Sequence, residues 1–159
     1  MSCSVWVIPI VICFLVNPAN ADEGDPWLMH PKQAANGVEY WSVSVDNDAG
    51  DILIAACAPS NKGVRVNVIP ARPFIYSDKI VKARYRVDDQ KSVSMNFHSV
   101  EERGTMVLFQ SAERMLRDIN KGSMHMEYQD GNVLAEFSLS GSHEALEFLG
   151  TMCPHIRLD

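Results

Sequence analysis

The sequence has little positive charge. It holds 14 Lys and Arg residues against 20 Asp and Glu residues, which gives a formal net charge of −6 at pH 7. Because proteins that bind nucleic acids neutralise phosphates with Lys and Arg, this balance argues against a nucleic acid as the partner. With 47% hydrophobic residues, 9 Gly and 8 Pro among 159 residues, the chain is neither collagen-like nor disordered, and its length fits one globular domain.

The chain also lacks an apolar run of the length that a bilayer requires, which is about 20 residues. Its longest run, Val5–Val16, is followed by Pro18 and by Ala19-Asn20-Ala21, which places small residues at the two positions that a signal peptidase recognises. We therefore expect 1–21 to be a cleaved signal peptide and the mature protein to be periplasmic, with no stable membrane span. A retained transmembrane helix is the weaker alternative.

Cysteine is scarce once the signal peptide is removed. Two of the four cysteines then remain, Cys57 and Cys153. In an oxidising compartment two cysteines most simply form one disulfide, which here would link an early strand to the C-terminal helix. A reactive thiol pair is the less favoured alternative, because the two residues lack the C-x-x-C spacing that lowers a thiol pKa.

Alternation of apolar and polar residues predicts an α+β fold, a mostly antiparallel β-sheet of about eight short strands with two helices. An extended lead-in over 22–36 precedes a single domain over 37–159. The clearest pattern lies in 79–87, and Ser140 or Ser142 is expected to cap the C-terminal helix. The expected strands are 38–45, 51–58, 64–68, 79–87, 93–98, 105–109, 124–128 and 133–139.

Two short segments match motifs of one protein family. Tyr85-Arg86-Val87-Asp88 fits Tyr-Arg-(Ile/Val)-Asp, and Phe137-Ser138-Leu139-Ser140-Gly141 fits Phe-Asp-(Leu/Ile)-Ser-Gly with Ser138 in place of the acid. In these motifs and in the order of elements from Ile52 to Cys153, the chain resembles the VasI-like family. These are exported bacterial proteins associated with type VI secretion, together with related uncharacterised periplasmic proteins. The resemblance implies a periplasmic accessory protein without known catalytic residues.

Met124, His125 and Met126 are weak candidates for a metal site, because thioether and imidazole ligands suit Cu(I). On a strand the two methionines share one face while His125 points to the other, which favours a core role for the methionines. The acidic segment 46–51 lacks the glycine and glutamate positions of a calcium loop and is expected to form a hairpin turn. We therefore expect no bound metal and no cofactor.

Motifs for catalysis are absent from the sequence. It has no G-x-S-x-G elbow, no H-E-x-x-H motif and no glycine-rich phosphate loop. Ser142-His143-Glu144 contains suitable residue types, but consecutive residues at a helix start point in different directions and cannot form a proton relay. We expect a protein that is not an enzyme and has no catalytic residues.

Lys82, Arg84 and Arg86 are the best candidates for contact with a partner, because they would form a basic ladder on one sheet face. Such a ladder suits a carboxylate, a phosphate or an acidic patch. A solvated face, with Arg86 paired to a neighbouring carboxylate, is the alternative. We expect a non-enzymatic periplasmic accessory or binding protein that contacts another envelope or secretion protein. Two other interpretations are a small-ligand or soft-metal (Cu) binding protein and an inhibitor of a cell-wall hydrolase.

Overall fold

Nine strands and two helices lie in the part of the chain that the computed structural model describes. That part comprises residues 27–33, 39–58, 63–71, 80–100, 105–108, 112–119, 123–128 and 133–157, so the expected signal peptide lies outside it. The strands are β1 (Leu28–Gln33), β2 (Glu39–Asp46), β3 (Ile52–Cys57), β4 (Val64–Ile69), β5 (Ile80–Val87), β6 (Val93–Val100), β7 (Thr105–Leu108), β8 (Ser123–Tyr128) and β9 (Val133–Ser138). The helices are α1 (Ala112–Asp118) and α2 (Ser142–Met152).

The nine strands form one antiparallel sheet in the order β1-β2-β3-β4-β7-β6-β5-β8-β9. The predicted α+β fold with a mostly antiparallel sheet and two helices is confirmed. The strand that the sequence did not indicate is β1, which lies within the segment expected as an extended lead-in and pairs with β2. Pro31 fits this edge position, because proline cannot donate a hydrogen bond to a second neighbouring strand.

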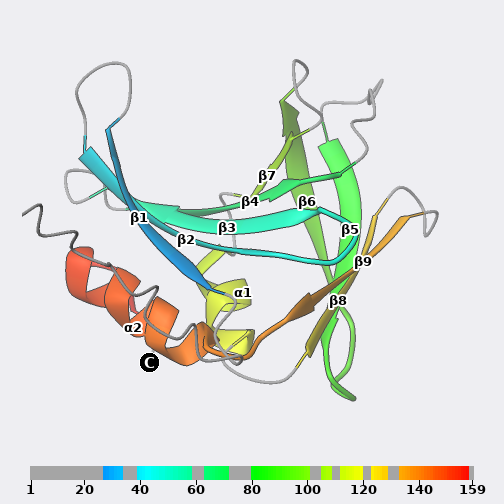
Figure 1. Ribbon diagram of the computed structural model, residues 1–159. Helices are drawn as coiled ribbons and strands as arrows, with labels where there is room; N and C mark the ends of the chain where they lie inside the picture. Colours follow the sequence, from blue (N-terminus) through cyan, green and yellow to red (C-terminus); the bar gives the residue numbers. More distant parts are fainter. Residues whose placement is uncertain are drawn as a thin grey trace, which may run out of the picture.

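The sheet is strongly curled, and both helices lie on its concave side (Figure 1). α2 contacts β2 and α1 contacts β4. β9 also contacts β2, although the two strands are far apart in the strand order, so the sheet wraps around a single core. Within the described ranges, neither helix is long and apolar enough to cross a membrane.

Alternation along each strand places one face in this core. In β5, burial alternates through Val81, Ala83, Tyr85 and Val87, while the residues between them point outward, as the sequence predicts. The strands therefore have an inner apolar face and an outer polar face, the arrangement expected of an antiparallel sheet with one covered side. The largest fully buried side chains are Tyr85, Phe97, Phe137, Leu53, Met115, Leu116, Ile119, Met124 and Met126.

α2 buries Ala145, Leu146 and Leu149 on its inner side. The prediction of a serine cap is wrong: the cap residue is Gly141, with φ 74°, and no side chain caps the helix. Glycine adopts this left-handed conformation without the steric cost that a Cβ brings. The chain therefore turns tightly from β9 into α2, and the Ser142 N–H donates to the Leu139 carbonyl at 3.1 Å.

A disulfide links Cys57 in β3 to Cys153, directly after α2, as predicted. The two Cα atoms are 6.4 Å apart, and 96 positions separate the residues in the sequence. Both cysteines belong to the core, and Trp41 of β2 contacts Phe148 of α2 edge to face with 5.8 Å between ring centroids. These contacts fix α2 against the first strands of the sheet.

The predicted turn between β2 and β3 is built around Asn47 and Asp51. The Asp51 N–H donates to Asn47 Oδ1 at 2.8 Å, and Asn47 Nδ2 donates to Asp51 Oδ2 at 3.0 Å. Asp51 Oδ1 also accepts from the backbone N–H of Ala71 at 2.9 Å. Because Asp51 is only 7% exposed, its carboxylate acts as an internal link between this turn and the chain that follows β4.

Candidate functional site

The outer face of β5 carries the three cations that the sequence singles out. Lys82 and Arg84 are exposed and Arg86 is half-buried. The neighbouring strands β6 and β8 bring their own outward side chains against this row. The structure gives the three cations different surroundings.

Arg84 is paired across the sheet with an acidic residue of β8. Its Nη2 lies 3.1 Å from Glu127 Oε2, and the two residues are directly opposite in the strand register. Their side chains are 59% and 47% exposed, so the ion pair is solvated and adds little to stability. Its effect is to hold the guanidinium along the sheet surface rather than extended into solvent.

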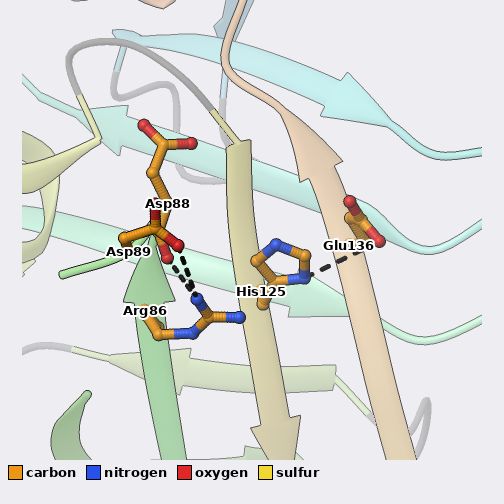
Figure 2. A network of polar contacts seen from close by, with 5 residues as sticks. All are labelled: Arg86, Asp88, Asp89, His125 and Glu136. Atoms are coloured by element: carbon orange, nitrogen blue, oxygen red, sulfur yellow. Dashed lines mark hydrogen bonds and ion pairs between the residues drawn. The ribbon is translucent and has the colours of Figure 1, made fainter. Parts of the chain in front are cut away.

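Arg86 belongs to the turn that follows β5. Its Nη1 donates to the Asp88 carbonyl oxygen and lies 4.0 Å from Asp89 Oδ1. Figure 2 shows these contacts beside a second pair, in which His125 Nδ1 of β8 lies 3.6 Å from Glu136 Oε2 of β9. Arg86 thus has a neighbouring carboxylate, and its guanidinium is engaged within its own turn.

Lys82 has no ion pair among the residues that the structure describes. It lies opposite Asn96 of β6, and Arg84 lies opposite Ser94 of the same strand. A depression of about 420 Å³, open to solvent, lies between these side chains. Ala83 and Met95 also line it, although their side chains belong to the core, so their backbones form its floor. We call this hollow the outer depression; its outward side chains are Lys82, Arg84, Ser94, Asn96 and Glu127.

The residues considered for a metal site do not converge. Met124 and Met126 are fully buried in the core, while His125 points to the outer face toward Glu136, as strand geometry predicts. Within the described part of the chain, no group of three or more His, Cys, Asp or Glu residues is placed to hold a metal ion.

The residues of Ser142-His143-Glu144 also point in different directions. Ser142 is fully buried, whereas His143 and Glu144 are exposed on the surface of α2. A serine nucleophile requires a base within hydrogen-bond reach. The segment does not present that arrangement.

An internal polar pair joins β5 to α1. The Tyr85 hydroxyl donates to Asp118 Oδ2, and the two residues are 33 positions apart in the sequence. Burial, followed by the hydrogen bond and the charge of Asp118, raises the pKa of Tyr85 above its usual value, and the charge of Arg114 partly opposes this rise. Tyr85 therefore stays a neutral donor at physiological pH and serves to position α1.

Sequence reasoning missed Ser94, Asn96 and Glu127 as neighbours of the basic ladder. Alternation within 93–98 and 124–128 would place all three on the outer face of their strands. What alternation does not reveal is that β6 and β8 flank β5, because strand order depends on long-range pairing. Prediction of the complete site therefore requires the strand order and register as well as the periodicity.

Comparison with known proteins adds no further site residues. No family model matches the chain, no curated protein matches it, and no solved structure matches it.

Proposed function

We propose that this chain is a non-enzymatic periplasmic accessory protein that binds a protein partner through the outer face of β6, β5 and β8. The observation that carries the proposal is the outer depression at the centre of that face. It gathers two cations, one carboxylate, one amide and one hydroxyl on strands held rigid by pairing on both sides. Pre-organised polar groups of this kind recognise a partner at low entropic cost.

The shape of the depression favours a large partner over a small ligand. Pockets for small molecules are concave, mostly apolar and bury most of the ligand. The outer depression lies open on the sheet face and is lined by charged and polar side chains together with apolar atoms, so it fits one or two side chains of a larger surface. The soft-metal interpretation gains no support from the geometry, because Met124 and Met126 face the core and His125 faces outward.

Two features support a periplasmic location and a role alongside secretion or envelope proteins. Disulfides persist in oxidising compartments, so the Cys57–Cys153 bridge is in keeping with export. The resemblance of 85–88 and 137–141 to VasI-like motifs supports a role with secretion or envelope proteins. We propose that the partner is one of these proteins.

The proposal is tested by a capture experiment that compares the unchanged protein with a variant in which a tyrosine side chain fills the outer depression. The disulfide-bonded chain without residues 1–21 is immobilised and exposed to an envelope extract, and bound proteins are quantified by mass spectrometry. We expect a partner that is retained by the unchanged protein and lost with Ser94→Tyr, because the new ring occupies the depression.

Ser92→Tyr is the matched control, since Ser92 is an exposed serine in the turn before β6 and does not line the depression. It should retain the partner, and thermal unfolding of both variants checks that they fold. A captured protein held equally by all three forms, or no captured protein at all, would refute the proposal.

A further inference from the structure

We infer that the partner presents an extended acidic segment that lies along β5, with a carboxylate in the outer depression against Lys82 and an apolar side chain against Ile80. The inference deepens the proposed function and rests on it. It follows from the charges in the outer depression and from the residue that borders it on the same strand face.

The outer depression has an excess of one positive charge. Lys82 and Arg84 contribute two cations and Glu127 contributes one carboxylate, in a chain whose formal net charge is −6. Since Glu127 already contacts Arg84, Lys82 is the cation left to bind an incoming group. An acidic segment is therefore attracted to this point and repelled by much of the remaining surface, which favours a single orientation of binding.

The spacing of the side chains suits a carboxylate. Lys82 and Asn96 lie opposite each other, as do Arg84 and Ser94. Opposite residues in antiparallel strands have Cβ atoms about 4.5–5.5 Å apart, and same-face neighbours along a strand are about 7 Å apart. A carboxylate between these four side chains can accept from the ammonium group and from the amide or hydroxyl group at once. A phosphate, which carries more negative charge, would meet stronger repulsion from Glu127.

Ile80 extends the surface with an apolar contact. It lies two residues before Lys82 and therefore on the same face of β5, and it is 51% exposed. Leu28 and Met29, the other large hydrophobic side chains exposed in the described part, belong to the edge strand β1. An extended segment with an apolar residue two positions from an acidic residue matches the spacing of Ile80 and Lys82.

The test uses a defined peptide and the disulfide-bonded protein without residues 1–21. The ¹⁵N-labelled protein is titrated with a blocked peptide of sequence Leu-Ser-Glu-Ser-Glu, and amide shifts are followed by NMR. We expect saturable shifts at Ile80, Lys82, Ser94 and Asn96, which weaken as ionic strength rises. Lys82→Gln should weaken binding by about fivefold, the upper range for one exposed ion pair.

Lys91→Gln is the control variant, because Lys91 is an exposed lysine outside the outer depression. It should bind the peptide as the unchanged protein does. The inference is wrong if the peptide gives no saturable shift, if the same peptide with Gln in place of Glu binds equally well, or if Lys82→Gln has no effect. Inorganic phosphate producing the same shifts at the same concentration would indicate a general anion site and also overturn it.

The two proposals fail separately. If Ser94→Tyr abolishes capture of the envelope partner while Lys82→Gln leaves both capture and peptide binding unchanged, the binding face stands and the acidic-segment inference fails. If the peptide binds as expected but no captured protein depends on Ser94, the proposed function fails.

Discussion

At the scale of single residues, Asp51 is the polar side chain on which the β2–β3 turn depends. Its carboxylate accepts from Asn47 and from the backbone of Ala71, and both donors lose their acceptor in Asp51→Ala. An unsatisfied buried polar group costs about 1–3 kcal/mol. We therefore expect Asp51→Ala to lower the free energy of unfolding by about this amount, measured by urea unfolding.

Asp48→Ala is the matched control, because Asp48 lies exposed in the same turn. A surface substitution of this kind changes stability by about 0.5 kcal/mol or less. Equal losses of stability in the two variants would contradict the prediction, because the buried carboxylate of Asp51 would then contribute no more than the exposed one of Asp48.

The candidate site shows how far residue-level reasoning extends. The period-two pattern of 79–87 was sufficient to place Lys82, Arg84 and Arg86 on one face. It did not reveal that Arg84 is held by Glu127 or that Lys82 lines a hollow, because both facts depend on which strands flank β5. Periodicity fixes the direction of a side chain, whereas its neighbours depend on pairing between distant segments.

At the scale of elements, the Tyr85–Asp118 hydrogen bond joins α1 to the sheet, and its strength depends on pH. The pKa of Tyr85 is raised in the folded state above the unfolded value of about 10, so the folded state holds the phenolic proton more tightly. Above about pH 10 the folded state therefore binds more protons than the unfolded state, and the free energy of unfolding falls as pH rises. Below pH 10 this contribution is fully present.

Tyr85→Phe should reduce stability at pH 7 by about 1.5–3 kcal/mol, the range for hydrogen bonds to charged groups. The variant should also lose less stability than the unchanged protein between pH 9 and 11, because the titrating phenol is gone. Urea unfolding at several pH values measures both effects. Tyr40→Phe retains Tyr85 and should keep the alkaline slope of the unchanged protein; equal slopes in all three forms would contradict the prediction.

Two elements show why local sequence was insufficient. β1 contains Pro31 and little alternation of apolar and polar residues, so nothing in its own residues indicated a strand. It is a strand because its backbone pairs with that of β2. The start of α2 offered two serines as caps, but Gly141 takes that position because the chain must reverse sharply after β9. In both cases tertiary packing outweighed local preference.

At the scale of the whole molecule, the Cys57–Cys153 disulfide closes a long loop and restricts the unfolded chain. The loop-entropy model gives about 4.7 kcal/mol for a loop near 100 residues, and the separation here is 96. We expect reduction to lower the free energy of unfolding by an amount of this order. The Cys57→Ser/Cys153→Ser double variant should show the same loss and no further response to reductant, and an unchanged urea midpoint on reduction would contradict the prediction.

The overall architecture was only partly accessible from the sequence. Counting alternating segments and the two remaining cysteines was enough for the fold class and the bridge. The strand order was not, because β7, β6 and β5 follow β4 in reversed order and β8 then pairs with β5. Strands that are adjacent in the chain usually pair with each other. The pairings β4–β7 and β5–β8 join strands that are distant in the chain, so no local sequence pattern predicted them.

The same disulfide determines how the molecule responds to mechanical tension. When the two ends of the chain are pulled, the shortest covalent path between them runs through the sulfur–sulfur bond, so the backbone between Cys57 and Cys153 is not extended. Cleaving the bond would release roughly 330 Å of additional contour, the extended length of 96 residues. Because β5, β6 and β8 all lie inside this segment, the candidate binding face is shielded from load applied at either end.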